Sequence, residues 1–218
     1  MTSELNIRSI YQELLKAYTP VTEAIIKKLM TVRGGVERTK VMFPPRDSDS
    51  FDAKQAEAGF LKYDCAILTA FRATRTRHGN LTMNGKLLKD LESNGFGIIR
   101  VDGCYREARE MEASREDSFF VYLNGNARKE DFFIKIYQLS EKYGQDSFLF
   151  KCAGMTRTAF LVSTNDDARQ QMGNIQLAGQ LYLNLPPIGP YSDLGKAGER
   201  IAFLVEKPED LLKVAETK

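Results

Sequence analysis

Three polar stretches of this sequence hold residue types that could do chemistry. The first is basic and runs from Thr69 through Arg72, Arg75 and Arg77 to Asn80. Planar guanidinium groups match the oxygens of an anion, and the free N–H groups at a helix N-terminus add to the attraction. This stretch therefore predicts an anion-binding site. The alternative is that its arginines are solvated or form surface ion pairs, which contribute roughly 0–1 kcal/mol each.

The other two stretches carry carboxylates and an amide. One contains Glu107 and Glu116, and the other contains Gln145 and Asp146. Carboxylates suit Mg²⁺ and can act as general acid and base, so the three acidic residues are candidate catalytic groups. Simple solvation of the loops and capping of a helix end are the alternatives. The candidate ligand-binding residues are Thr69, Arg72, Arg75, Arg77, Asn80 and Gln145.

Hydrophobic patterns predict the elements that position these stretches. Short apolar runs typical of strands alternate with helical spacing in the order strand-helix-strand-strand-helix-strand. The strands are expected at 64–71, 97–101, 118–123 and 147–151, with helices around 81–94 and 132–143. This order is that of a ferredoxin-like split βαβ core, an α+β fold, and right-handed crossovers give the strand order 4-1-3-2.

That topology would bring the three polar stretches together. The first two strands would be parallel and would end at the same edge of the sheet. The helix after the third strand would return the chain to that edge, where the fourth strand begins. We therefore expect the basic, acidic and amide-bearing stretches to share one rim. Asn80 would serve there as a helix N-cap or turn residue, with ligand contact as the alternative.

The chain divides into three predicted parts: residues 1–60, 61–152 and 153–218. The first is a helical hairpin, broken at Thr19-Pro20, followed by a connector; the second is the α+β core. The third is an α/β extension packed on that core. Its expected elements are a strand at Ala159–Ser163, a helix at Gln170–Leu183, a Pro/Gly-rich loop at Leu185–Gly198, a strand at Ile201–Val205 and a helix at Pro208–Val214.

Composition limits the classes of function. A net charge of +2 is too small to imply nucleic-acid binding by itself. Three cysteines, no cationic leader and no apolar run near 20 residues predict a cytoplasmic protein without a membrane segment. The lone His78 and the absence of a CxxC pair argue against a zinc site, and no metal is predicted.

Residues 63–150 resemble a bacterial and phage family that is known as a domain of unknown function. The shared features are Thr69-Ala70-Phe71, Asn80, a leucine-bearing helix, Gly103, Glu116 with Ser118-Phe119-Phe120-Val121, and Tyr143-Gly144-Gln145. No activity is attached to that family, so the resemblance implies a fold boundary and a site and leaves the reaction open.

Three functions remain open from the sequence, and the cofactor and the enzymatic status stay undetermined. The leading hypothesis is a binding module whose rim takes a phosphate-bearing ligand, a nucleotide or a nucleic-acid strand. The second is a metal-assisted phosphoester hydrolase that uses Glu107, Glu116 and Asp146. The third is a protein-interaction or inhibitory factor of a phage or mobile element, with the N-terminal helices or the Leu185–Gly198 loop as its interface.

Overall fold

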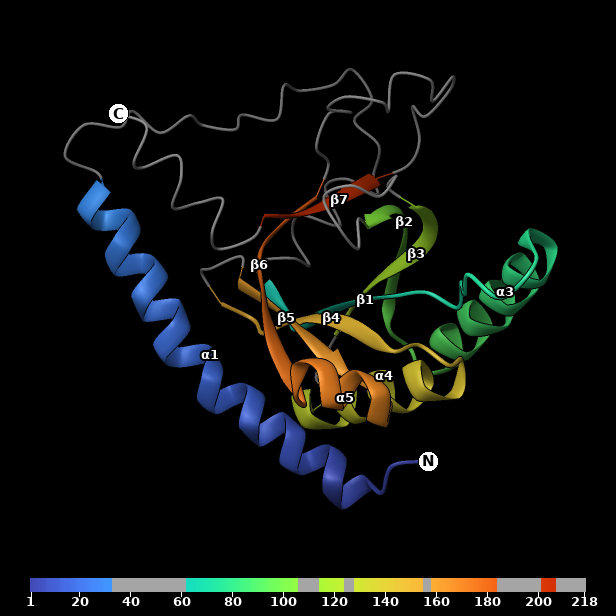
Figure 1. Ribbon diagram of the computed structural model, residues 1–218, viewed down its shortest axis with the longest axis horizontal. Helices are drawn as coiled ribbons and strands as arrows, with labels where there is room; N and C mark the ends of the chain where they lie inside the picture. The colour runs from blue at the N-terminus through green and yellow to red at the C-terminus, as the bar shows by residue number, and fades with distance from the viewer. Residues whose placement is uncertain (33–61, 106–113, 124–127, 155–157, 184–200, 207–218) are drawn as a thin grey trace.

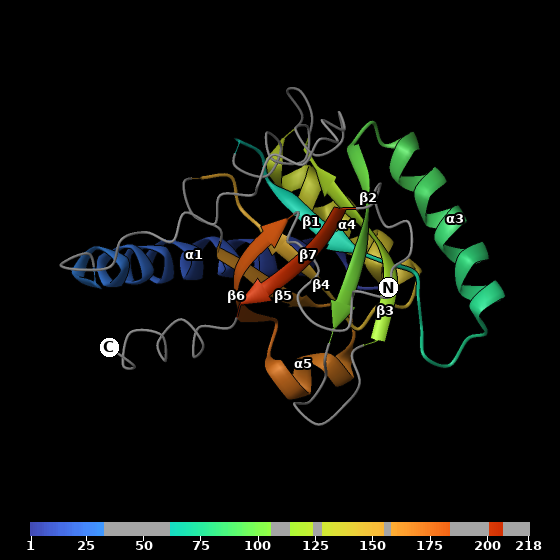
Figure 2. The ribbon, with the colours of Figure 1, turned by 90° about the horizontal axis from the view of Figure 1, so that it is seen from above.

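The computed structural model describes residues 1–32, 62–105, 114–123, 128–154, 158–183 and 201–206. In these ranges seven strands form one closed barrel in the order β1-β3-β2-β7-β6-β5-β4 (Figure 1 and Figure 2). The strands are β1 (Cys65–Leu68), β2 (Gly97–Tyr105), β3 (Ser114–Tyr122), β4 (Ser147–Lys151), β5 (Thr158–Ser163), β6 (Ile175–Leu183) and β7 (Ile201–Glu206). The helices are α1 (Glu4–Val32), α3 (Arg77–Ser93), α4 (Lys129–Lys142) and α5 (Asp166–Met172).

The strands of the predicted core stand in the predicted order. Within the barrel, β4, β1, β3 and β2 are consecutive, and β1 and β2 both pair antiparallel with β3, so they are parallel to each other. The α+β class is confirmed. The ferredoxin-like arrangement is not confirmed, because the sheet does not stay open. Strand β5 pairs with β4, β7 pairs in parallel with β2, and β6 joins them, so that each of the seven described strands has a partner on both sides.

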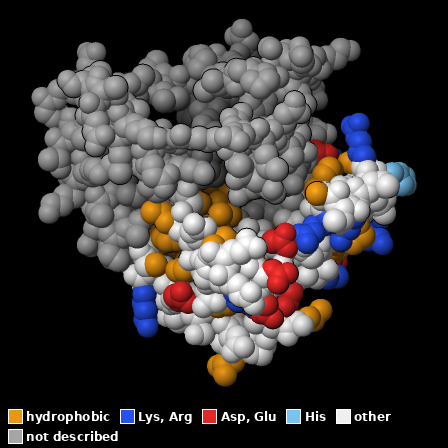
Figure 3. All heavy atoms as spheres, viewed as in Figure 1, with side chains coloured by type: hydrophobic (Ala, Val, Ile, Leu, Met, Phe, Trp, Pro, Cys, Tyr) orange, Lys and Arg blue, Asp and Glu red, His pale blue; other side chains and the backbone are white. Residues whose placement is uncertain are grey.

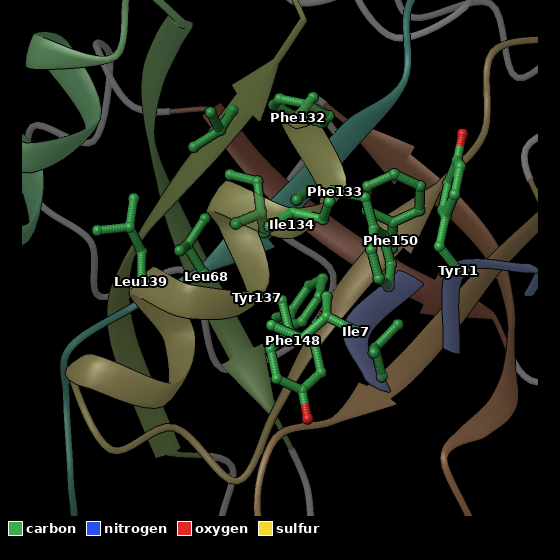
Figure 4. Packing of buried hydrophobic residues seen from close by; sticks show 14 of the residues in the cluster. Ile7, Tyr11, Leu68, Phe132, Phe133, Ile134, Tyr137, Leu139, Phe148 and Phe150 are labelled. Atoms are coloured by element: carbon green, nitrogen blue, oxygen red, sulfur yellow. The ribbon is translucent and has the colours of Figure 1, made fainter. Parts of the chain in front are cut away.

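The larger hydrophobic core lies between the barrel wall and the helices. Alternate residues of β1, β3, β4 and β5 face outward to this core, as Phe119 and Val121 of β3 do. The ring of Phe133 on α4 lies 4.9 Å from that of Tyr11 on α1 and meets that of Phe150 on β4 edge-on at 5.0 Å (Figure 4). These aromatic contacts fix α1 and α4 against the strands.

The smaller core fills the barrel. Phe120 and Tyr122, which alternate with the outward residues of β3, pack there with Cys65, Ile67 and Ile99. Tyr122 lies opposite Gly97 in the register of β2 and β3. A Cβ atom at position 97 would come within 2.2 Å of the Tyr122 ring, so only glycine fits there. The pairing of β2 with β3 at this position therefore depends on glycine, the residue that has no side chain.

The predicted N-terminal hairpin is wrong, because α1 is one helix that continues through Pro20. A proline inside a helix removes one backbone hydrogen bond and strains the preceding turn. The flanking sequence contains no glycine or asparagine between Ile7 and Val32 that would end the helix, so it continues. Ile7 and Leu14 anchor its first half in the core, and Figure 2 shows the helix projecting from the side of the barrel.

The predicted helix at Gln170–Leu183 is also wrong. Helix α5 ends at Met172, followed by Gly173 at φ 74°, and the chain then forms β6. Ile175 and Leu177 alternate with polar residues, which is the period of a strand. The predicted strands at 159–163 and 201–205 are confirmed as β5 and β7.

Several expectations lie outside the described residues. These are the connector between α1 and β1, the Leu185–Gly198 loop and the helix at Pro208–Val214. The division into three parts stays a prediction, although β5, β6 and β7 complete the same barrel as β1 to β4. None of the described helices is long and apolar enough to cross a membrane.

Candidate functional site

The candidate site is built around the turn that leaves β1. We call the edge of the barrel at this turn the rim. Thr69 Oγ1 accepts a hydrogen bond from the Phe71 backbone N–H at 3.1 Å and donates to the Asp117 carbonyl of β3 at 2.7 Å. A single buried hydroxyl therefore shapes the turn and ties it to the neighbouring strand.

Two buried asparagines of α3 hold the same turn. Asn84 Oδ1 accepts from the Ala70 N–H at 2.9 Å, and its Nδ2 donates to the Asp117 carbonyl at 2.9 Å. Asn80 Oδ1 accepts from the Arg72 N–H at 2.9 Å, and its Nδ2 donates to the Arg72 carbonyl at 3.0 Å. Three consecutive backbone N–H groups, those of residues 70, 71 and 72, are thus each satisfied by a side chain.

The helix cap differs from the sequence prediction. Thr76 is the N-cap of α3, and its hydroxyl accepts from the Gly79 N–H at 3.1 Å. Asn80 instead lies one turn into the helix, where its amide faces back to Arg72. The prediction of Asn80 as N-cap is therefore wrong, because the helix begins earlier than its apolar spacing indicates.

The third polar stretch meets the first across the rim. Gly144, at φ 74°, ends α4 and lets the chain turn. Gln145 Nε2 then donates to the Phe71 carbonyl at 3.2 Å, and the Arg72 Nη1 lies 2.7 Å from Asp146 Oδ2. Arg75 Nη1 donates to the Ala70 carbonyl at 2.8 Å. The predicted convergence of these stretches is present in the structure.

The two residues that precede α5 contribute contacts that the sequence did not indicate. Asn165 Nδ2 donates to Asp146 Oδ1 at 2.6 Å, and the Thr164 hydroxyl donates to the Gln145 carbonyl. Asn84 was missed as well. It lies four residues after Asn80 and on the same helix face as Leu87 and Leu91, and that spacing could have revealed it.

The remaining candidates lie apart from this network or cannot be placed in it. Arg77 and His78 are exposed on the first turn of α3 and make no hydrogen bond to the described part of the rim. Glu107 is outside the described residues. Glu116 belongs to β3, where its backbone lies opposite Gly103 of β2.

Charges at the rim are mostly paired with each other. The Arg72–Asp146 pair is 31% and 59% exposed, so screening leaves it little energy of its own. Its value is geometric, since it fixes the guanidinium. Figure 3 shows acidic and basic side chains next to one another where α3 meets the body of the barrel.

A second charged group joins α3 to the end of α4. Asp90 accepts hydrogen bonds from Lys142 Nζ and from the Tyr143 hydroxyl, each at 2.7 Å. These bonds lower the pKa of Asp90 below its ordinary value. Burial, together with the bond to Asp90, raises the pKa of Tyr143. The residue just before Gly144 is thereby held in place.

The described residues offer no cluster of three His, Cys, Asp or Glu side chains that could hold a metal ion. Cys65 and Cys152 are buried free thiols, and burial raises the pKa of each to about 12. Neither is therefore an activated nucleophile.

Comparison with known proteins identifies the family. Residues 66–184, more than half of the chain, match the S-adenosylmethionine lyase family, and the chain belongs to that family. Two solved structures are similar. A phage SAM lyase in complex with S-methyl-5′-thioadenosine is 18% identical, with a TM-score of 0.30, and the match covers 48% of this chain and 92% of that one. A phage SAM lyase in the apo state is 15% identical, with a TM-score of 0.29, over 47% and 89% of the two chains. No curated protein matches.

This match corrects the functional hypotheses. The expected family of unknown function is corrected, because the matching family carries a named activity. S-adenosylmethionine has no phosphate, so the phosphate-binding and phosphoester-hydrolase hypotheses are wrong. A lyase family is a family of enzymes, so the hypothesis of an interaction or inhibitory factor is wrong as well. In the structure Arg72 pairs with Asp146 and Arg75 bonds to a backbone carbonyl, and the ligand-binding role of the candidate residues stays a prediction.

Proposed function

We propose that this protein is an S-adenosylmethionine lyase whose substrate binds at the rim. The observation that carries the proposal is the family match, which runs from β1 to β6 and therefore includes every element that contributes to the rim. The dense bonding of the 69–72 turn supports the location, because binding sites need groups that are held in place before the ligand arrives.

The chemistry of the substrate limits what a lyase must do. The sulfonium carries a methyl group, the adenosyl group and a 3-amino-3-carboxypropyl chain. When the carboxylate oxygen of that chain attacks the carbon bonded to sulfur, a C–O bond forms and the C–S bond breaks. The bonding electrons go to sulfur, giving neutral S-methyl-5′-thioadenosine and homoserine lactone. Atoms and charge balance without a proton transfer.

For such a reaction the protein must hold the substrate in a folded conformation and exclude water from the site. A carboxylate and a sulfonium cancel each other's charge in the transition state, so a site that removes water favours the reaction. Holding the chain folded, with the carboxylate behind the carbon, adds a gain from orientation. A free cation on the carboxylate would oppose the attack, and the pairing of Arg72 with Asp146 at 2.7 Å limits that effect at the rim.

The test is incubation of the purified protein with S-adenosylmethionine in ¹⁸O-water, with products followed by mass spectrometry. We expect S-methyl-5′-thioadenosine and homoserine lactone. Homoserine that forms later by ring opening would carry ¹⁸O in its carboxyl group. Label in the hydroxyl group would show direct hydrolysis, and vinylglycine would show elimination. Absence of S-methyl-5′-thioadenosine would overturn the proposal.

A matched pair of variants tests the location. Arg75→Ala removes the bond to the Ala70 carbonyl and should lower kcat/KM about tenfold or more, as the loss of a charged hydrogen bond predicts. Arg77→Ala removes the same charge from an exposed position two residues away and should change kcat/KM less than about threefold. Equal effects of the two substitutions would place the site elsewhere.

A further inference from the structure

Phe71 is an aromatic residue at the rim that lies outside the two hydrophobic cores of the described residues. Its side chain is partly exposed, and within the described residues it belongs to neither hydrophobic cluster. No described aromatic ring lies against the Phe71 ring. The ring of Phe133 in the larger core, by contrast, contacts several other rings. A single exposed aromatic residue is by itself ordinary in a folded protein.

The backbone of Phe71 is held on both sides. Its N–H donates to Thr69 Oγ1, and its carbonyl accepts from Gln145 Nε2. The neighbouring N–H groups of Ala70 and Arg72 are bound by Asn84 and Asn80. The ring therefore extends from a backbone whose position is fixed, which keeps the entropy cost of using it in binding low.

Helix α3 uses two of its buried positions to hold the backbone around Phe71 and not for apolar packing. Its buried face consists of Asn80, Asn84, Leu87 and Leu91, so amides occupy two of four positions where leucine would pack. Burying an amide costs free energy unless all its hydrogen bonds are made, and both side chains here direct theirs to the turn or to Asp117. Departures of this kind from good core packing are typical of functional sites.

We propose that Phe71 is the residue on which the adenine ring of the substrate stacks. The inference rests on the proposed function and adds the nucleobase contact to it. The face of a base stacks on an aromatic side chain with about 1–3 kcal/mol per base. An aromatic ring that extends from a fixed backbone and belongs to neither described hydrophobic core is suited to that contact.

The experiment measures binding of S-methyl-5′-thioadenosine and of 5-methylthioribose, which lacks the base, by calorimetry. Phe71→Leu should weaken the nucleoside's Kd about tenfold and leave the base-free compound unchanged, since only the stack is lost. Phe71→Tyr keeps an aromatic face and should stay within about threefold of the wild type. In turnover, Phe71→Leu should raise KM and spare kcat, because stacking is the same in the ground and transition states.

Phe96→Leu is the matched control, because Phe96 is partly buried, packs against the larger core and contacts Phe132 edge-on at 5.0 Å. It should lower stability and leave the nucleoside's Kd unchanged. Intermolecular NOEs between the Phe71 ring and adenine protons in the wild-type protein give a measurement independent of any variant. An unchanged Kd in Phe71→Leu, or absence of these NOEs, in a protein that cleaves S-adenosylmethionine overturns this inference alone. A wild type that neither binds the nucleoside nor cleaves the substrate overturns the proposed function and this inference together.

Discussion

The side-chain amide of Asn84 donates to the Asp117 carbonyl at 2.9 Å and so joins helix α3 to strand β3 at the rim. The same amide accepts from the Ala70 N–H, which makes Asn84 the shared partner of two polar stretches that are far apart in sequence. Removal of a buried group with two such bonds is costly, because its buried partners are left without a hydrogen bond and without water to replace it.

Asn84→Asp tests this relationship with nearly unchanged shape. The new oxygen cannot donate to the Asp117 carbonyl, so two oxygens would face each other. We expect the free energy of unfolding in urea to fall by about 1–3 kcal/mol, and KM for S-adenosylmethionine to rise. The control is Asn6→Asp, exposed in the first turn of α1, where a negative charge is neutral or slightly favourable. Equal stability of the Asn84 variant and the wild type would contradict the structure of the rim.

Substitution of two glycines, one in β2 and one in α3, by alanine should change the stability of the protein in opposite directions. Gly97→Ala would place a methyl group 2.2 Å from the Tyr122 ring and should destabilise the protein by about 1–3 kcal/mol through overpacking. Gly85→Ala lies in α3 with nothing within 4 Å of its Cβ and should stabilise it by roughly 0.5–1 kcal/mol. Thermal unfolding of both variants checks the prediction. A stable Gly97→Ala would mean that β2 and β3 pair in another register.

The central strands were predictable because their information is local. Four short apolar runs, with helices after the first and third, fix the order β4-β1-β3-β2 by connection rules alone. The closure of the barrel was not predictable in this way. It depends on the parallel pairing of β2 with β7, which joins segments about a hundred residues apart. No local turn signal in the sequence indicates a pairing over such a distance.

The contacts of the rim were not predictable for a similar reason. The sequence placed the basic and amide-bearing stretches together, but the role of Arg72 depends on which partner reaches it. Asp146 lies in the turn between α4 and β4 and is held by Asn165, the N-cap of α5, and neither contact follows from spacing along the chain. The prediction of a helix break at Pro20 was wrong for the opposite reason. Proline disfavours the interior of a helix, but good helix-forming residues on both sides keep α1 continuous.

The Asp90–Tyr143 hydrogen bond gives a prediction for pH. The folded state lowers the pKa of Asp90 through Lys142 and Tyr143, so this contribution to stability is present above the unfolded value near 3.8 and is lost as pH falls through the folded value. The pKa of Tyr143 is raised, so its contribution holds below about 10 and is lost as pH rises through the folded value.

Tyr143→Phe should therefore bring the pKa of Asp90 back toward its ordinary value, though not fully, because Lys142 remains. Carboxyl NMR shifts followed through an acid titration measure this directly. Tyr63→Phe removes a phenol that stacks on Tyr122 instead and should leave Asp90 unchanged. A Tyr143→Phe protein in which Asp90 titrates as in the wild type would show that Lys142 alone sets the pKa.

Asp146 is the candidate catalytic carboxylate whose side chain the structure describes. In the structure both its oxygens are occupied, one by Arg72 and one by Asn165, and the proposed reaction moves no proton. Asp146→Asn should therefore lower kcat less than about tenfold and leave the pH dependence of kcat unchanged between about pH 6 and 9. Asp166→Asn, at a carboxylate 87% exposed beside Arg169, is the control for removing one negative charge nearby. General acid–base catalysis is worth roughly 10²–10⁴ in rate, so a loss of that size with an altered pH profile would make Asp146 a proton-transfer group and would exclude a purely intramolecular displacement.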